Sequence, residues 1–352
     1  MKKVLILLFL LGLSLLLISC GKDSKYEFKY WNDAKAITEL TNYVEDVTNE
    51  KSANYIPVED RIATFDMDGT LCGELFPTYL EYLICAYRVL DDPTCNPTDE
   101  MIDVANQIRA GWLEDGTGKY DSNMAIMHAN TQAKAFAGMT LLQFENWVKN
   151  FMQTEAFGFK NMKYADCFYL PMLEVIDYLN QNEFLTYIVS GSDRFICRTV
   201  ASSICNIPYE RIIGMDVNLV ATDEDEVEGV NYQFKATDSV LRGDKLLVKN
   251  LKFNKVAQIT QEIGRQPVLS FGNSSGDVSM HLYTITNNKY KSLAFMLIAD
   301  DEARDYGNET KNTELGKTWE EYGFIVISMK NDFKTIYGYD VVKTANNKKE
   351  VK

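Results

Sequence analysis

The stretch RIATFDMDGTL at residues 61–71 guides the interpretation of the rest of the chain. Its apolar half predicts a buried strand, which ends in two carboxylates, Asp66 and Asp68, with one residue between them. Alternate residues of a strand share a face, so the two side chains are expected to point the same way. Two like charges this close repel unless a cation lies between them or one carboxyl keeps its proton. Taken alone, the pattern also fits a simple β-turn.

The composition is that of a globular, acidic protein. The chain has 352 residues, of which 46% are hydrophobic and 24% charged, and its formal net charge is −14. This length is sufficient for one large domain or two smaller ones with a buried core. The negative charge argues against broad contact with nucleic acid or anionic lipid, because both would be repelled. A small anionic substrate in a locally positive pocket is compatible with it.

The N-terminus has the pattern of a secretory signal. Lys2 and Lys3 precede an apolar run that is short for a membrane span and closes with LISCG at 17–21. This ending resembles a bacterial lipobox, which implies cleavage before Cys20 and a lipid on its sulfur. We therefore expect a signal peptide over 1–19 and an extracytoplasmic protein anchored to a bacterial membrane, inner or outer. A plain signal peptide or a short hydrophobic anchor is the alternative.

Six cysteines remain after the leader: Cys72, Cys85, Cys95, Cys167, Cys197 and Cys205. An oxidising compartment permits disulfides, but the spacing does not select one of the roughly 15 pairings that six cysteines allow. Cys197 and Cys205 would lie roughly 12 Å apart on one helix, too far for a bridge. The sequence has no Cys-x-x-Cys pair and only two histidines, His128 and His281, so it does not indicate a zinc site.

Apolar strands alternate with helical patterns along the chain. After the opening strand, strands are expected at 184–189, 268–271, 293–299 and 324–327, and a hairpin at 217–237. This alternation indicates a doubly wound parallel sheet of the α/β class, with helices on both faces. In such a sheet ligands bind beyond the carboxyl ends of the strands. The polar residues that follow these ends are therefore expected to meet at one rim.

Between the first two strands the pattern is helical. Apolar stripes and a capping box at Thr140 and Gln143 predict several helices and little β-structure. We therefore expect a helical cap over 75–166, inserted into an α/β core of 59–74 plus 167–345. A tether and an N-terminal amphipathic helix are expected over 20–58.

Three polar clusters and one lysine resemble the motifs of the haloacid dehalogenase (HAD) superfamily. DMDGTL at 66–71 is similar to the first motif, and Ser190 after Tyr187-Ile188-Val189 is similar to the second. GNSSGD at 272–277 is similar to the fourth, and Lys255 to the third, with Lys245 and Lys249 as rival lysines. The resemblance covers about 61–330 and is greatest to phosphoserine-phosphatase-like members with a helical cap and to their secreted relatives. It implies a Rossmann-type core and phosphatase activity.

The resemblance also implies roles that fit the chemistry of phosphoester hydrolysis. Asp66 would be the nucleophile that forms an aspartyl-phosphate, and Asp68 would be the general acid and base. Ser190, the backbone around Gly191 and Lys255 would hold the phosphoryl oxygens. For Ser190 alone, a helix N-cap is the alternative role.

The implied metal is Mg²⁺. Its ligands would be Asp66, the backbone carbonyl of Asp68 and the side chain of Asn273, with Asp277 supporting the site through Lys255 or a metal-bound water. Most relatives have Asp where this chain has Asn273, so the site has one negative charge fewer and we expect weaker metal affinity. Glu74 and Arg194 follow two of the motifs and are candidate substrate contacts.

The function expected from these motifs is Mg²⁺-dependent hydrolysis of a small phosphomonoester. The alternative from another class is a phosphate-ligand binding lipoprotein that has lost turnover, which only Asn273 supports. A dehalogenase is disfavoured by Asp68, because halide leaves without a proton. In the helical cap Tyr79, Tyr82, Trp112 and Trp147 either cage a quaternary ammonium such as phosphocholine or pack in the core. Nucleic acid is not an expected partner.

Overall fold

The computed structural model describes residues 26–73, 76–113, 120, 122–225 and 227–344. The expected leader, the expected lipid-bearing Cys20 and the candidate contact Glu74 lie outside the described residues. No helix within these ranges combines the length and the apolar character needed to cross a membrane.

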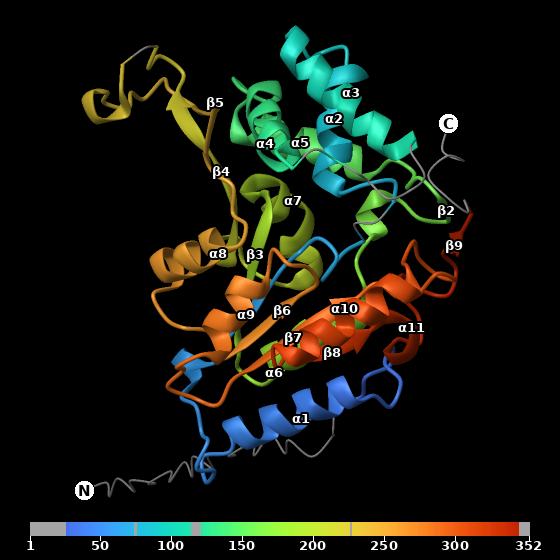
Figure 1. The fold of residues 1–352 in the computed structure, drawn as a ribbon. Coiled ribbons are helices and arrows are strands. Elements are labelled where there is room, and N and C mark those ends of the chain that lie inside the picture. Colours follow the sequence, from blue (N-terminus) through green and yellow to red (C-terminus); the bar gives the residue numbers. More distant parts are fainter. Residues whose placement is uncertain (1–25, 74–75, 114–119, 121, 226, 345–352) are drawn as a thin grey trace, which may run out of the picture.

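A seven-stranded sheet forms the centre of the molecule (Figure 1). Its order is β5-β4-β3-β1-β6-β7-β8, and neighbouring strands are parallel except for β4 and β5. The strands are β1 (Ile62–Phe65), β3 (Leu185–Asp193), β4 (Ile212–Ala221), β5 (Val240–Val248), β6 (Leu269–Gly272), β7 (Leu293–Ile298) and β8 (Ile325–Ser328). A separate antiparallel pair joins β2 (Phe159–Lys160) to β9 (Val342–Lys343).

Helices pack against both faces of this sheet. They are α1 (Lys35–Thr48), α6 (Leu170–Gln181), α7 (Arg194–Cys205), α8 (Phe253–Gln258), α9 (Val278–Ile285), α10 (Glu309–Glu321) and α11 (Met329–Asp332). Alternation along β7 shows the two sides, because Phe295 and Leu297 join the main core while Met296 and Ile298 pack with Trp319 of α10. The expected doubly wound α/β architecture is therefore confirmed.

Of the helices between β1 and β3 in the sequence, the first four form the helical segment above the sheet in Figure 1. They are α2 (Leu80–Leu90), α3 (Asp99–Leu113), α4 (Met124–Ala135) and α5 (Leu141–Met152). The predicted capping box of α5 is present, since the Thr140 hydroxyl accepts from the Gln143 N–H and the Gln143 amide oxygen from the Thr140 N–H. The division of the chain at 58, 74 and 166 stays a prediction.

The antiparallel edge differs from the sequence prediction. The hairpin was expected over 217–237, but its second strand is β5, which begins only at Val240. Two backbone hydrogen bonds explain the placement of β5: the Gly138 N–H donates to the Arg242 carbonyl, and the Arg242 N–H donates to the Met139 carbonyl. The edge strand is therefore held by the helical segment as well as by β4.

Candidate active site

The carboxyl ends of β1, β3 and β6 open into one cavity of about 290 Å³. Its described lining comes from the strand ends, the start of α8 and the helical segment. The lining residues are Asp66, Asp68, Tyr79, Glu81, Tyr82, Ala125, Gly191, Ser192, Lys249, Leu251, Lys252, Lys255, Ser274, Ser275, Gly276 and Asp277. Most of the candidate catalytic residues thus meet at the rim where a parallel sheet binds its ligands.

The loop after β1 is a tight turn that aims Asp66 and Asp68 into the cavity. The Asp66 N–H donates to the Phe271 carbonyl of β6 at 2.9 Å, which fixes the nucleophile candidate at the strand end. Gly69 has φ of +80°, a conformation that glycine adopts without strain, and the turn reverses there. The loop after β1 is therefore a glycine-containing turn and also carries the two carboxylates into the cavity.

Lys255 joins the carboxyl ends of β1 and β6. Its ammonium lies 2.5 Å from Asp66 Oδ1 and 2.6 Å from Asp277 Oδ1, and its side chain is 1% exposed. The other carboxylate oxygen of Asp277 accepts the backbone N–H groups of Asn273 and Ser274, both at 3.1 Å. Asp277 thus positions both Lys255 and the loop that carries Asn273.

The rival lysines are placed differently. Lys245 is exposed on β5 and does not line the cavity. Lys249 does line it, but its ammonium lies 2.6 Å from Glu81 Oε1 rather than against Asp66. Of the three candidate lysines, only Lys255 forms an ion pair with Asp66.

The buried charges perturb one another. Burial, together with the charge of Asp277, raises the pKa of Asp66 to about 8, although Lys255 opposes this shift. Burial also disfavours ionised Asp277, but the Lys255 ammonium and backbone N–H donors outweigh it and lower the pKa of Asp277. Without a further cation, the ionised pair is therefore Lys255 with Asp277, and Asp66 holds a proton near neutral pH.

Asp68 has the environment of a proton-transfer group. Its Oδ2 accepts the Ser192 hydroxyl at 2.6 Å and the Ser190 hydroxyl at 3.4 Å. Its Oδ1 is buried and has no hydrogen-bond partner among the described residues. Burial first, and the Glu81 charge second, raise the pKa of Asp68 to about 6. A carboxyl with this pKa can both donate and accept a proton near neutral pH.

Ser190 and Gly191 lie at the bend of β3 beside Asp68. The Ser190 hydroxyl accepts the Ser192 N–H at 3.0 Å, and its carbonyl accepts the Asn250 side-chain amide at 2.9 Å. Ser190 is fully buried, so Gly191 and Ser192 form the cavity wall instead. The alternative N-cap role for Ser190 is wrong, because Asp193 caps α7 through the N–H groups of Phe195 and Ile196.

The donors at the ends of β1 and β6 fit Mg²⁺. Asp66, the Asp68 carbonyl and Asn273 offer only oxygen ligands, the type that Mg²⁺ prefers. At the end of β1, Asp68 Oδ1 is buried without a hydrogen-bond partner among the described residues, and the Thr70 hydroxyl lies a long 3.5 Å from Asp66 Oδ2. Both carboxylate oxygens can therefore still accept a further partner. Within the described ranges no group of three or more His, Cys, Asp or Glu side chains is arranged around a metal position, so the fit depends on the carbonyl and the amide.

Arg194 is a correction to the expected substrate contacts. Its Nε and Nη2 donate to the two carboxylate oxygens of Asp216 at 2.6 and 2.7 Å, and its Nη1 donates to Glu262 at 2.7 Å. These pairs turn the guanidinium away from the cavity, whose described lining does not include Arg194. The sequence showed only that Arg194 follows the second motif, which does not determine the direction of its side chain.

The structure adds residues that the sequence analysis missed. Glu81 on α2 reaches the cavity and pairs with Lys249, and Ser192 binds Asp68. Of the four aromatic residues considered for a cage, Tyr79 and Tyr82 line the cavity. The other two, Trp112 and Trp147, pack within the helical segment. No sequence pattern marks Glu81, because α2 is buried on most of its surface.

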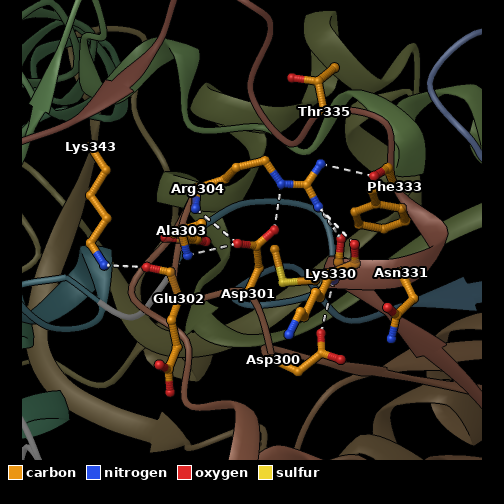
Figure 2. Close-up of polar contacts among 12 residues, drawn as sticks. Asp300, Asp301, Glu302, Ala303, Arg304, Lys330, Asn331, Phe333, Thr335 and Lys343 are labelled. Carbon is orange, nitrogen blue, oxygen red and sulfur yellow. Dashed lines mark hydrogen bonds and ion pairs between the residues drawn. The ribbon is translucent and has the colours of Figure 1, made fainter.

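The acidic end of β7 has a structural role (Figure 2). Asp300 accepts the Ser328 hydroxyl at 2.5 Å and the Lys330 N–H at 3.0 Å. Asp301 accepts the Arg304 N–H at 2.8 Å and forms an ion pair with the Arg304 guanidinium. These carboxylates fix the loop after β7 to the start of α11 and do not line the cavity.

Comparisons with known proteins identify the fold. No family model matches the chain, and no curated protein matches it significantly. The chain is similar to the structure of a conserved functionally unknown protein from Anaerococcus prevotii DSM 20548, with 15% identity, coverage of 87% of this chain and 94% of that chain, and a TM-score of 0.51. This likeness shows a shared fold.

Two more distant structures are of proteins named for an enzymatic activity. One is cytosolic 5'-nucleotidase IIIB bound to cytidine, with 11% identity, coverage of 84% of this chain and 87% of that chain, and a TM-score of 0.46. The other is a phosphoserine phosphohydrolase-like protein from Francisella tularensis subsp. tularensis SCHU S4, with 13% identity, coverage of 76% and 94%, and a TM-score of 0.40. At this distance neither activity transfers to this chain.

Proposed function

We propose that this chain is a Mg²⁺-dependent phosphatase of the haloacid dehalogenase type that hydrolyses a small phosphomonoester. The observation that carries the proposal is the convergence of Asp66, Asp68 and Lys255 on one cavity, with Asp277 holding the lysine. These are the groups that attack on a phosphoryl dianion requires: a nucleophile, a proton donor and a fixed positive charge.

Asp66 attacks phosphorus and forms an aspartyl-phosphate while the bond to the leaving oxygen breaks. Asp68, whose pKa burial and Glu81 raise to about 6, donates its proton to that oxygen. The Asp68 carboxylate then takes a proton from water as the water oxygen attacks phosphorus, and Asp66 is released. Lys255 neutralises charge on the phosphoryl oxygens, and the backbone N–H of Gly191 donates a hydrogen bond to them.

Asp66, the Asp68 carbonyl and Asn273 would hold Mg²⁺. When bound there, the ion supplies the positive charge that keeps Asp66 ionised and offsets its repulsion from the phosphoryl dianion. Asn273 contributes an oxygen without a charge, so affinity for the ion is expected to be modest.

The test is phosphate release from a panel of phosphomonoesters, including phosphoserine, phosphocholine and nucleotides, with Mg²⁺ and with a chelator. We expect turnover that needs Mg²⁺ and is lost in Asp66→Asn. The matched control is Asp244→Asn, which removes an exposed carboxylate on β5. An acid-quenched digest should show phosphate on Asp66. Binding of phosphate esters without any turnover would instead support the phosphate-binding lipoprotein.

The location outside the cytoplasm is a separate part of the proposal. It rests on the lipobox-like sequence at Cys20, and the anchor would attach the phosphatase to a bacterial membrane surface. Partition of the full-length protein into a detergent phase, lost in Cys20→Ala, is the expected result. Full-length protein that stays in the aqueous phase would refute the lipid anchor without affecting the catalytic proposal.

A further inference from the structure

Part of the cavity wall comes from the helical segment rather than from the strand ends. Glu81 on α2 and Lys249, which follows β5, both line the cavity although they lie 168 positions apart in the sequence. The Lys249 ammonium lies 2.6 Å from Glu81 Oε1, and the two side chains are 6% and 8% exposed. A buried ion pair therefore joins the helical segment to the core inside the cavity, and neither member takes part in the proposed bond-breaking steps.

Glu81 has one carboxylate oxygen that lacks a hydrogen-bond donor. Its Oε2 is buried and has no hydrogen-bond partner among the described residues. His128 does not provide a donor: burial lowers its pKa, so the ring is neutral, and its one proton lies on Nε2, 3.1 Å from the Glu81 carbonyl. The Ser192 hydroxyl donates its hydrogen to Asp68 at 2.6 Å. Because an unpaired buried carboxylate oxygen is costly, this position favours a ligand that brings a donor.

Two aromatic rings line the cavity close to Glu81 in the sequence. The rings of Tyr79 and Tyr82 lie edge to face, with their centroids 5.2 Å apart. The faces of aromatic rings attract cations, as a carboxylate does. A neutral hydroxyl could also donate to Glu81, but it would gain little from the rings. The combination of a carboxylate and two tyrosine rings therefore favours a cationic ligand.

We propose that Glu81, together with Tyr79 and Tyr82, binds a primary ammonium group on the leaving group of the substrate. The preferred substrate class is then a short phosphomonoester that carries an amine, for which phosphoethanolamine is the probe. The placement of its phosphoryl group against Asp66 rests on the proposed phosphatase function. Since Asp68 and Glu81 line one cavity, the leaving oxygen lies near Asp68 while the amine extends towards the helical segment.

The unpartnered oxygen distinguishes a primary from a quaternary ammonium. A primary ammonium has three N–H donors, so it can bind Oε2 of Glu81 while Lys249 keeps Oε1. A quaternary ammonium has no N–H group and would leave Oε2 unpaired. Its attraction would depend on the rings of Tyr79 and Tyr82 alone, because Trp112 and Trp147 do not line the cavity. Phosphocholine is therefore expected to bind less tightly than phosphoethanolamine.

The experiment compares phosphoethanolamine, phosphocholine and ethyl phosphate as ligands of the full chain carrying Asp66→Asn. Affinities are measured by isothermal titration calorimetry with Mg²⁺ present. A charge-assisted hydrogen bond predicts that phosphoethanolamine binds roughly 10-fold to 100-fold more tightly than ethyl phosphate, with phosphocholine between them. The three esters share the phosphoryl group, so the ratio of their affinities does not depend on how well the variant holds the metal.

A second substitution in the same background tests the residue. Adding Glu81→Gln should reduce the advantage of phosphoethanolamine over ethyl phosphate to less than about threefold. The matched control is Glu155→Gln, which removes an exposed carboxylate from the chain between β1 and β3 and should keep the full advantage. If Glu81→Gln fails to fold because Lys249 is left unpaired, Glu81→Gln with Lys249→Met removes both charges and should lose the advantage in the same way.

Equal affinities for the three esters, tighter binding of phosphocholine, or no binding of phosphoethanolamine would overturn the proposed ammonium site. So would equal values of kcat/KM for phosphoethanolamine and ethyl phosphate in the wild-type chain, and the phosphatase proposal would then still stand. Failure of the phosphatase proposal gives a different result, in which no ester releases phosphate. Preferential binding of phosphoethanolamine in that case would support the ammonium site in a protein without turnover.

Discussion

Replacing Lys255 by Met removes the cation that holds two buried carboxyl groups. The ammonium contacts Asp66 at 2.5 Å and Asp277 at 2.6 Å, and the side chains of these partners are 9% and 1% exposed. Methionine fills nearly the same space as the lysine stem, so the change is mainly one of charge. We expect the variant to lose most of its activity and much of its stability.

The magnitude follows from the protonation states. At pH 7 a pKa of about 8 keeps Asp66 largely neutral, so Lys255 balances one ionised partner, Asp277. Its removal leaves the Asp277 carboxylate buried without a counter-charge, which typically costs about 3–5 kcal/mol. The backbone N–H groups of Asn273 and Ser274 still bind Asp277, so the lower half of this range is expected.

The assay is urea unfolding at pH 7 in chelator, followed by tryptophan fluorescence and circular dichroism. The matched control is Lys252→Met, which removes an exposed lysine from the same loop and should change the free energy of unfolding by less than about 0.5 kcal/mol. Adding Asp277→Asn to Lys255→Met removes the surplus charge and should recover part of the loss. The electrostatic reasoning is refuted if Lys255→Met is as stable as wild type, or if the double variant shows purely additive losses.

Three further predictions concern proton transfer, the metal and pH. Asp68→Asn should lower kcat by roughly 10²-fold or more for alkyl phosphates but far less for p-nitrophenyl phosphate, whose leaving group needs no proton; equal losses for both would contradict the role. Asn273→Asp should lower the half-saturating Mg²⁺ concentration by roughly tenfold, measured by activity titration, because it adds a charged oxygen ligand; an unchanged titration would exclude it as a ligand. Burial raises the pKa of Asp305 to about 6, so between about pH 4 and 6 the native state holds a proton on Asp305 that the unfolded state has lost. Wild-type stability should therefore fall as pH rises over this range. Asp305→Asn lacks this loss, so its stability relative to wild type should rise by at most roughly 3 kcal/mol over that range in denaturant titrations, and a constant difference would refute the shift.

The parts of the fold that local patterns specify could be predicted from the sequence. The strands β1, β6 and β7 are continuous apolar runs followed by polar clusters, so their approximate positions and their parallel arrangement follow from composition alone. The capping box of α5 could also be predicted, because a cap depends on residues three positions apart. Lys255 was predicted from its approximate spacing before the last motif. In the structure it differs from its rival Lys249 because Lys255 contacts Asp66, whereas Lys249 contacts Glu81.

What the sequence did not predict depends on contacts between distant segments. Glu81 and Lys249 are separated by 168 positions, and neither lies in a recognisable pattern. The strand β5 was missed because its polar centre, Arg242 to Lys245, hides the alternation; Arg242 is fully buried only because Asp193 and the ring of Phe144 receive its guanidinium. A charged residue that tertiary partners bury has no local signal.

The charges around the cavity give a reason to expect a metal that does not depend on family resemblance. The described lining contains the carboxyl groups of Asp66, Asp68, Glu81 and Asp277. Two of the three lysines in this lining, Lys249 and Lys255, are already in ion pairs; the third, the exposed Lys252, forms no ion pair with the described residues. A phosphomonoester dianion entering this cavity would therefore meet too little positive charge to bind, and a divalent cation at the ends of β1 and β6 would correct this deficit. If the proposed metal site is correct, Asn273 would have two opposite effects: its neutral amide would weaken the hold on the cation, and it would also lower the repulsion that the substrate dianion meets. An Asp at this position should accordingly tighten metal binding and raise KM for the phosphoester together.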